Sequence, residues 1–219
     1  MASILPFDEM NSFTTRLRAM YPDGKLPPRK EAKEEEEDII DEMLDLFLLA
    51  YAQGVEVTTE NLTVLPFTEI PQGSAQTGRP GGSAEVQQRA ERLATYKPTI
   101  DDVMKVVNAE VAGKTWKDRT EDYFSNGGTV DDLIRIVETE VHRDANEAAL
   151  STAKRAGATK KTWVTMMDEK VRDTHQYLEM MSVGINEDFY TYDGDHAPAP
   201  GLFSLPENNI NCRCELVFS

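Results

Sequence analysis

Residues 129–157 read TVDDLIRIVETEVHRDANEAALSTAKRAG and predict the longest helix of the chain, running to about Arg155. Thr129 suits the N-cap position, because its hydroxyl can accept a backbone amide while Asp132 answers from the third helical position. Gly157 is the expected C-terminal stop. One side of the helix carries apolar or small residues at helical spacing: Leu133, Ile136, Val137, Val141, Ala145, Ala148 and Thr152.

Two polar residues of this helix need a separate interpretation. Glu140 falls on or beside the apolar side, where an unpaired carboxylate would be costly to bury. We therefore expect Arg143 or Arg172 to pair with it. His142 stands among charged neighbours, so we predict that it faces solvent.

The segment from Glu31 to Tyr51 predicts an asymmetric helix. Its first part is acidic, which complements the helix dipole, and its second part is apolar nearly all round. It is either an ordinary core helix or a docking helix for another chain. Gly54 is the expected stop, and residues 55–68 are expected to form a weak strand or an extended arm.

A Pro/Gly-rich stretch over residues 66–82 predicts a linker or a long surface loop. We place the main break of the chain here, between a helical and extended region over 1–82 and an α+β domain over 83–219. Three helices are predicted before the long one: residues 83–96, a helix capped by Thr99 and Asp102, and residues 115–124. A further amphipathic helix is expected near the start of the chain, over residues 7–20.

The C-terminal third predicts strands. Residues 161–167 alternate in polarity and indicate one strand, with Asp168 placed to cap a helix over residues 169–179. Residues 184–210 are rich in loops, and residues 210–218 predict a final strand. The expected fold class is α+β: a mostly helical N-terminal two-thirds, with a small β-sheet built by the C-terminal strands and packed on the long helix.

Asp168, Arg172 and His175 are spaced by four and three residues. If Asp168 caps the predicted helix, all three project from roughly one side of it. A carboxylate, a guanidinium and an imidazole would then share one face.

The chain has two cysteines, and on a strand Cys212 and Cys214 present both sulfurs to one face while Arg213 points to the other. If that strand pairs near His175, one imidazole nitrogen and two thiolates converge, a ligand set that suits zinc. The fourth ligand would be one of four candidates: Asp168, Asp173, His196 or water. The competing interpretation is two buried free thiols packed beside a histidine. A disulfide between the cysteines is opposed by a reducing compartment and by the extended geometry.

Catalytic signatures are few. A water at the fourth zinc position would make hydrolysis conceivable, with Asp168 or Glu140 as acid or base. The sequence has no H-E-x-x-H pair, P-loop, G-x-G-x-x-G or G-x-S-x-G pattern. We therefore assign no catalytic residue.

The composition is acidic, with 23 Lys+Arg against 39 Asp+Glu and a formal net charge of -16. Bulk charge thus disfavours nucleic-acid binding, which depends on cationic neutralisation of phosphates. A local basic cluster is expected at the end of the long helix: Lys154, Arg155, Lys160 and Lys161. No apolar run is long enough for a membrane span, and MASILPFDEM lacks a basic signal-peptide start, so we expect a soluble protein made in a reducing cytoplasm.

At these residues the chain resembles the phage Mu F-like head morphogenesis family, also called minor head or minor capsid proteins. The matching pieces lie within residues 129–219 and occur in this order: Glu140 and Asn146, Trp163-x-Thr165-x-x-Asp168, Val171-Arg172-x-x-His175, Phe189, and Asn211-Cys212-Arg213-Cys214. One feature departs from the pattern. The family commonly has a glycine shortly after the Leu that follows the histidine, whereas here Leu178-Glu179 leads to Met180. We expect the turn to be made later, at Gly184.

The resemblance implies a tailed-phage minor head protein that acts in head assembly near the portal and has a role in DNA packaging or delivery. Its implied partners are the portal, the major capsid protein or the scaffold, and further copies of itself, without a membrane. It would be made in the host cytoplasm and reside in the virion. The resemblance also implies a metal site at His175, Cys212 and Cys214. The alternative is a zinc-dependent hydrolase or toxin-like effector packaged in the virion.

Overall fold

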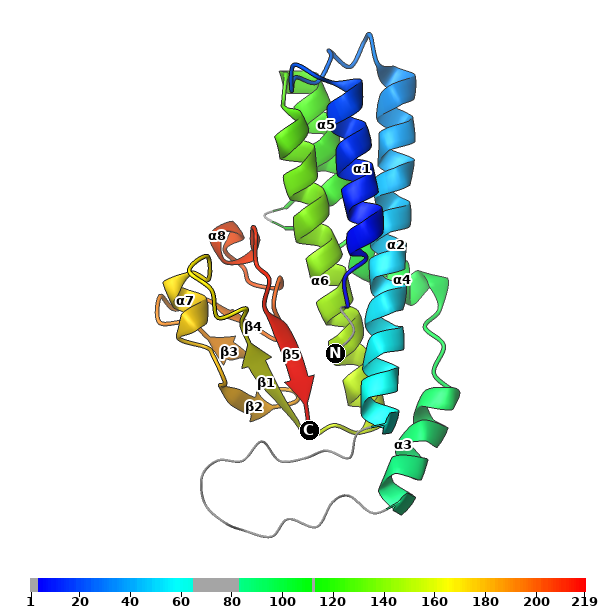
Figure 1. Ribbon diagram of the computed structural model, residues 1–219, viewed down its shortest axis with the longest axis vertical. Coiled ribbons are helices and arrows are strands. Elements are labelled where there is room, and N and C mark those ends of the chain that lie inside the picture. Colours follow the sequence, from blue (N-terminus) through cyan, green and yellow to red (C-terminus); the bar gives the residue numbers. More distant parts are fainter. Residues whose placement is uncertain (1–3, 65–82, 112) are drawn as a thin grey trace.

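The computed structural model describes residues 4–64, 83–111 and 113–219 (Figure 1). The linker predicted for residues 66–82 lies outside the described residues. The described chain consists of an upright helical bundle with a small β-containing lobe beside it. We call the part from residue 157 to 219 the C-terminal lobe.

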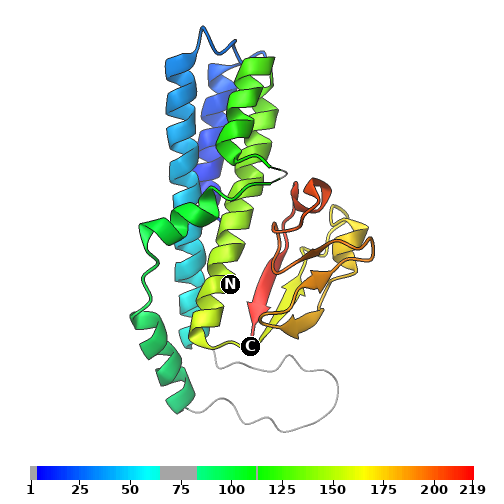
Figure 2. The ribbon, with the colours of Figure 1, turned by 180° about the vertical axis from the view of Figure 1, so that it is seen from behind.

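Four helices run alongside one another in the bundle: α1 (Phe7–Met20), α2 (Lys33–Val64), α5 (Trp116–Asn126) and α6 (Val130–Ala156). Two further helices pack against α2 and α6 from outside: α3 (Ser83–Ala94) and α4 (Ile100–Val107). In both ribbon views α6 lies between α2 on one side and the C-terminal lobe on the other (Figures 1 and 2). The long helix predicted from the sequence therefore holds the two parts of the molecule together.

Helix starts follow the predicted cap chemistry. Thr99 and Thr129 each accept a hydrogen bond from the backbone amide three residues on, while Asp102 and Asp132 answer the cap amide. α5 begins with the same arrangement at Thr115. Three N-termini are thus fixed by hydrogen bonds between residues three positions apart, without tertiary partners.

α2 is longer than predicted, and the expected stop at Gly54 is wrong. A Cβ added to Gly54 would lie 2.5 Å from the Ala145 carbonyl oxygen and 3.0 Å from the Ala148 Cβ. Glycine therefore permits α2 to approach α6 closely. The strand or extended arm expected after Gly54 is also wrong as far as Val64, because burial of Val57 against the bundle outweighs the strand preference of β-branched residues.

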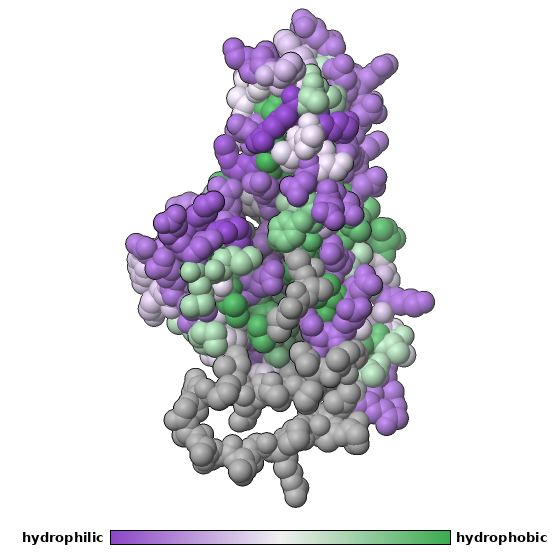
Figure 3. Space-filling view, in the orientation of Figure 1, coloured by the Kyte–Doolittle hydropathy of each residue, from purple (hydrophilic) through white to green (hydrophobic). Residues whose placement is uncertain are grey.

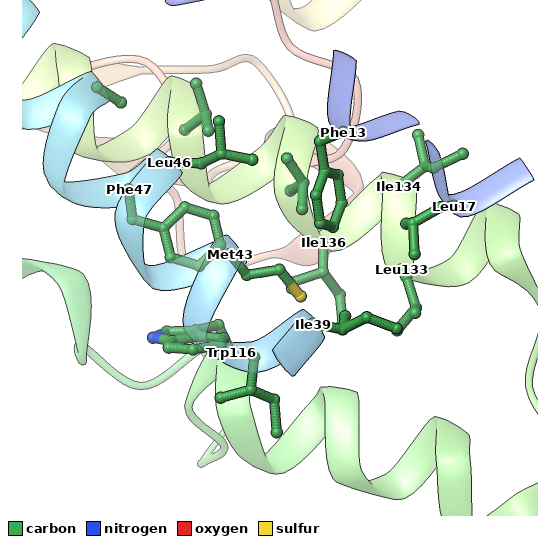
Figure 4. Close-up of a cluster of buried hydrophobic side chains, with 14 of the residues drawn as sticks. Phe13, Leu17, Ile39, Met43, Leu46, Phe47, Trp116, Leu133, Ile134 and Ile136 are labelled. Carbon is green, nitrogen blue, oxygen red and sulfur yellow. The ribbon is translucent and has the colours of Figure 1, made fainter. Parts of the chain in front are cut away.

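The core of the bundle is built from apolar side chains of α1, α2, α5 and α6 (Figure 4). Its labelled members are Phe13, Leu17, Ile39, Met43, Leu46, Phe47, Trp116, Leu133, Ile134 and Ile136. The rings of Phe47 and Trp116 meet edge to face, with centroids 5.0 Å apart. This core joins residues from both sides of the proposed break at residue 82, and the position of that break stays a prediction.

The C-terminal lobe contains a three-stranded antiparallel sheet in the order β2-β1-β5 and a two-stranded ribbon of β3 and β4. Its elements are β1 (Lys160–Val164), α7 (Asp173–Gln176), β2 (Ser182–Gly184), β3 (Phe189–Tyr190), β4 (His196–Ala197), α8 (Pro206–Asn209) and β5 (Glu215–Phe218). β5 packs against α6, which confirms the predicted α+β class with its sheet on the long helix. The final strand begins at residue 215, later than predicted. The helix expected over residues 169–179 shrinks to the single turn of α7.

On one face of the molecule, the upper end of the bundle is largely polar (Figure 3). Figure 3 shows hydrophilic residues over most of the visible upper end of the bundle. None of the helices within the described ranges is long and apolar enough to cross a membrane.

Candidate functional site

His175, Cys212 and Cys214 lie together in the C-terminal lobe, as the sequence predicts. All three are buried, and their ligand atoms lie within 4.8 Å of one another. His175 Nδ1 is 3.6 Å from Cys212 Sγ and 3.4 Å from Cys214 Sγ. α7 positions the histidine, and the extended segment before β5 turns both sulfurs to the same side. We call these three residues the His/Cys cluster.

The two nitrogen–sulfur separations of the His/Cys cluster fit those around a zinc ion. Tetrahedral zinc with ordinary Zn–S and Zn–N bonds places nitrogen and sulfur ligands about 3.6 Å apart. The two observed separations match that value. A cavity of about 10 Å³ adjoins the cluster, with Met166, Arg172 and Asn211 in its wall. Such a volume holds roughly one water or ion and leaves no room for a substrate.

The two thiols differ in acidity. Burial opposes ionisation of Cys212, but a hydrogen bond with Cys214 and the charges of Arg172 and Arg213 lower the pKa of the Cys212 thiol. Its hydrogen bond to Cys212, together with burial, raises the pKa of Cys214. The pair therefore carries one thiolate before it carries two, and a metal cation would favour the second ionisation.

Asp168 was one of the predicted fourth zinc ligands, but it is not part of the His/Cys cluster. Its two carboxylate oxygens accept hydrogen bonds of 2.8 and 2.7 Å from Arg213, which lower the pKa of Asp168. Asp168 also accepts the Lys170 amide, so it makes a local turn rather than capping a helix. Arg213 is held by this pair, and the prediction that it points to the opposite face from the sulfurs stays a prediction.

Two other predicted ligands also lie elsewhere. Asp173 is exposed at the start of α7. His196 is exposed in β4, stacks on Tyr190 and places Nδ1 2.9 Å from the Asp188 carboxylate. Water remains the candidate fourth ligand among those that the sequence suggested.

Aromatic and backbone contacts enclose the His/Cys cluster. Trp163 is fully buried, and its ring meets His175 edge-on with centroids 5.3 Å apart. Phe203 stacks on the imidazole with its centroid 5.4 Å away, and it also contacts the Trp163 ring. Arg172 donates to the carbonyl of Ile210, next to Asn211, whose φ of 57° turns the chain into the cysteine segment. Arg172 therefore positions the cysteine segment rather than sharing a helix face with Asp168.

His142 joins α6 to the cysteine segment, and the prediction that it faces solvent is wrong. It is buried, with Nε2 2.8 Å from the carbonyl oxygen of Cys214. A carbonyl only accepts, so Nε2 carries the proton. Asn146 then uses its amide for the His142 carbonyl at 2.9 Å. Burial lowers the pKa of His142 to about 4, which keeps the imidazole neutral near pH 7.

Glu140 is fully buried and is paired with two arginines, Arg143 and Arg119. Arg143 was a predicted partner, whereas Arg172 is not one, and Arg119 of α5 gave no sequence signal. Arg143 also donates to three carbonyls at the end of α4, those of Val106, Val107 and Ala109. Through these contacts and the His142 bond, α6 holds α4, α5 and the lobe.

The turn that follows α7 is made at Met180, not at Gly184 as predicted. Met180 has a φ of 59°, a left-handed conformation that glycine adopts more readily. Its amide donates to the Trp163 carbonyl at 2.9 Å, which fixes β1 to this turn. A methionine thus occupies the conformation for which the family pattern uses a glycine nearby.

The basic cluster predicted at the end of α6 does not form a four-cation surface. Lys161 is fully buried and donates to the Pro198 carbonyl at 2.6 Å, and burial lowers its pKa to about 8. The Arg155 guanidinium lies over the Tyr96 ring. Lys154 and Lys160 are exposed.

The fold and the site define an α+β protein whose C-terminal lobe is closed by a buried histidine–cysteine cluster and fastened to one long helix. A family model described as Phage Mu protein F like protein matches residues 88–217, more than half of the 219 residues. The chain belongs to this family. The matched range contains α4 to α8 and nearly all of β5.

Two curated relatives have informative names. The chain is 25% identical over 166 residues to an NAD(+)--arginine ADP-ribosyltransferase of Enterococcus faecalis, covering 59% of this chain and 34% of that protein. It is 28% identical over 83 residues to minor head protein GP7 of Bacillus phage SPP1, covering 36% of this chain and 27% of that protein. The chain thus spans about a third or less of the length of these relatives. No solved structure gives a significant match.

Proposed function

We propose that this chain is a minor head protein of a tailed phage and acts in head assembly near the portal. The observation that carries the proposal is the family match over residues 88–217. Within that range, the residues of the family resemblance interlock: the α6 segment containing Glu140 and Asn146 reaches the cysteine segment through His142. The name of the relative in phage SPP1 supports the same role.

In this role the chain would bind virion proteins, namely the portal, the major capsid protein or the scaffold, and would assemble with further copies of itself. It would be made in the host cytoplasm and retained in the virion. The net charge of -16 argues against direct binding to DNA, so any part in packaging or delivery would work through protein partners. Specific partners would meet the bundle or the lobe without needing an active site.

The test is reconstitution of particles from the cognate head proteins with and without this chain. We expect the chain to co-purify with heads, to crosslink to the portal and to change the yield of DNA-filled particles when omitted. Glu140→Ala and the exposed-site control Asp45→Ala would be compared for incorporation. A chain absent from purified heads, with assembly unchanged by its omission, would contradict the proposal.

We also propose that His175, Cys212 and Cys214 hold a structural zinc ion with water as the fourth ligand. Zinc there would tie α7 to the cysteine segment, and the small adjoining cavity supports a structural rather than a catalytic role. Protein purified without chelator should contain about one zinc per chain. Cys212→Ser with Cys214→Ser should remove it, while His196→Asn should retain it. Substoichiometric zinc in the unaltered protein would eliminate this proposal.

The second candidate function is an enzymatic effector packaged in the virion, which the ADP-ribosyltransferase relative favours. The proposed acid or base residues oppose its hydrolase version, because Glu140 is bound by Arg119 and Arg143 and Asp168 by Arg213. We expect no NAD⁺ consumption with arginine-containing acceptor proteins. Acceptor labelling that requires both NAD⁺ and this chain would establish the effector instead.

A further inference from the structure

A cavity of about 420 Å³ lies between α2, α4 and α6, away from the His/Cys cluster. Its size is within the range of small-molecule sites, roughly 300–1,000 Å³. Its wall contains Tyr51, Tyr96, Glu147, Ser151, Arg155 and, from the C-terminal lobe, Leu202. None of these residues takes part in the proposed function, and the inference does not depend on that function.

Glu147 is the unmatched group of this cavity. It is half-buried on α6, and no hydrogen bond or ion pair reaches its carboxylate from the residues that the structure describes. Burial raises the pKa of Glu147, although Lys154, Lys161 and Arg143 oppose this by charge at longer range. The cavity therefore presents a carboxylate that accepts from no donor in the described part of the chain.

The aromatic wall suits a planar cation. The hydroxyl of Tyr96 lies 3.5 Å from Ser151 Oγ, and the buried ring of Tyr51 lies on the α2 side. Arg155 places its guanidinium carbon 5.1 Å from the centroid of the Tyr96 ring. This contact shows that the tyrosine at the cavity stacks with a guanidinium group, an arrangement favoured by the ring quadrupole.

Two other charged residues of the wall, Arg143 and Asp102, have close partners. Arg143 donates to Asp144 and to the carbonyls at the end of α4, and Glu140 balances its charge. At the rim, Asp102 caps α4 and lies in the field of Arg155 and Lys105. Of the two carboxylates in the wall, Glu147 is therefore the one that no described residue reaches, and the cations Lys105 and Arg155 in the same wall form no ion pair with it.

We propose that this cavity binds an alkylguanidinium group, with the Glu147 carboxylate accepting its N–H donors between the tyrosine side chains. A guanidinium presents parallel donors that match a carboxylate, which a point-charge ammonium does not. The group has two possible sources: an arginine side chain of a partner polypeptide, or a free guanidino compound.

Amide chemical-shift titration of the full chain tests the proposal with three probes: N-acetylarginine amide, agmatine and the neutral isostere N-acetylcitrulline amide. We expect saturable shifts at Ala109 and Ser151 with the two guanidinium probes and none with the citrulline probe. Glu147→Gln should weaken binding at least tenfold, and Asp45→Asn, an exposed carboxylate on α2, should leave it unchanged. Tighter binding of N-acetylarginine amide indicates a polypeptide source, and tighter binding of agmatine indicates a free compound.

Ala109→Phe provides a second variant that keeps Glu147 and blocks the cavity from an exposed position. It should abolish the shifts even if Glu147→Gln is poorly folded. Equal affinity in Glu147→Gln, equal binding of the citrulline probe, or shifts that persist in Ala109→Phe would overturn the proposal. So would saturable binding of inorganic phosphate that depends on Lys105 and Arg155 and excludes agmatine.

Discussion

The helical bundle and the C-terminal lobe are stabilised in different ways. In the bundle, aliphatic and aromatic side chains from four helices fill one continuous core (Figure 4). The lobe has a smaller apolar cluster around Trp163, and hydrogen bonds of individual side chains hold several of its loops. The comparison teaches that one protein can specify its larger part by hydrophobic pattern and its smaller part by individual hydrogen bonds.

Asp195 is the clearest example of a side chain that holds the lobe by hydrogen bonds. Its carboxylate accepts from the backbone amides of His196, Ser204 and Leu205, from the Ser204 hydroxyl and from the Asn208 amide. These bonds hold a loop of the lobe that has almost no regular structure. Each region also contains one tryptophan, Trp116 in the bundle and Trp163 in the lobe, so the two can be followed separately.

The largest effect is expected from the core of the bundle. Phe47→Ala should lower the free energy of unfolding by about 4 kcal/mol, because it removes a buried ring and leaves a cavity. Both tryptophan signals should shift together in urea titrations, since the lobe needs α6 to pack against. Leu49→Ala, at a partly exposed site on α2, is the control and should cost much less. A lobe signal that stays in place would show that the lobe folds without the bundle.

A smaller effect, confined to the lobe, is expected from Asp195→Asn. Replacing a charged acceptor of several hydrogen bonds should cost about 3 kcal/mol. The Trp163 signal, measured with Trp116→Phe as background, should shift to lower denaturant. The Trp116 signal, measured with Trp163→Phe, should not move. Coincident shifts of both signals would break the comparison, because they would make the two regions one cooperative unit.

The pH dependence should also separate the regions. Burial raises the pKa of Asp144 in α6 to about 8, so between its unfolded value and pH 8 the native bundle binds a proton that the unfolded chain does not. Bundle stability should therefore rise as pH falls from 8 to 6.5, by up to about 1.4 kcal/mol per pH unit. Asp144→Asn should flatten this slope in urea titrations at several pH values.

The lobe should respond to acid with the opposite sign. Burial works against ionisation of Asp195, but its hydrogen bonds lower its pKa, and a hydrogen bond from Thr191 lowers the pKa of Asp193. The stability that these carboxylates contribute is present above their ordinary pKa and is lost as pH falls through the lowered values. The Trp163 signal should thus lose stability only in strong acid. A Trp163 signal that loses stability between pH 8 and 6.5 would contradict this.

The smallest expected effect is a gain in the stability of the lobe. The non-glycine residues with positive φ in the described chain all lie in the lobe: Met167, Met180 and Asn211. Met180→Gly should stabilise the lobe by about 0.7 kcal/mol, because glycine adopts a φ of 59° without steric cost. Met166→Gly is matched in exposure, 48% against 49%, but lacks the positive φ, and it should not stabilise. Thermal unfolding of both variants measures the difference.

Local chemistry made much of the bundle predictable. The Thr99 and Thr129 caps, the extent of α6 and its stop at Gly157 follow from hydrogen bonds within a few residues. The length of α2 could not be predicted, since Gly54 and the β-branched residues after it indicate a break when α6 is not considered. His142 was misassigned for a similar reason: its charged neighbours suggest solvent, but α6 is covered on both sides.

The candidate site was predictable where the alternation of side chains along an extended segment decides which way each one points. Cys212 and Cys214 must face the same way in an extended segment, and the structure places both beside His175. Asp168 was misplaced because its contact with Arg213, 45 positions away, leaves no local signal. The pairing of Arg119 with Glu140 and the hydrogen bonds of Asp195 could not be predicted from the sequence either, since only the folded chain brings these partners together.

Because Gly54 has no side chain, it determines how α2 and α6 are aligned along their axes. Where α2 crosses α6, Gly54 faces Ala145 and Ala148, and the space for a Cβ is absent. Sliding α2 by one turn, about 5.4 Å, would bring Ala50 or Thr58 against the same backbone. Aliphatic faces elsewhere along the two helices would tolerate such a slip. The hydrogen atom of Gly54, in place of a methyl group, thus selects a single alignment of α2 on α6, the most extensive helix–helix contact of the described chain.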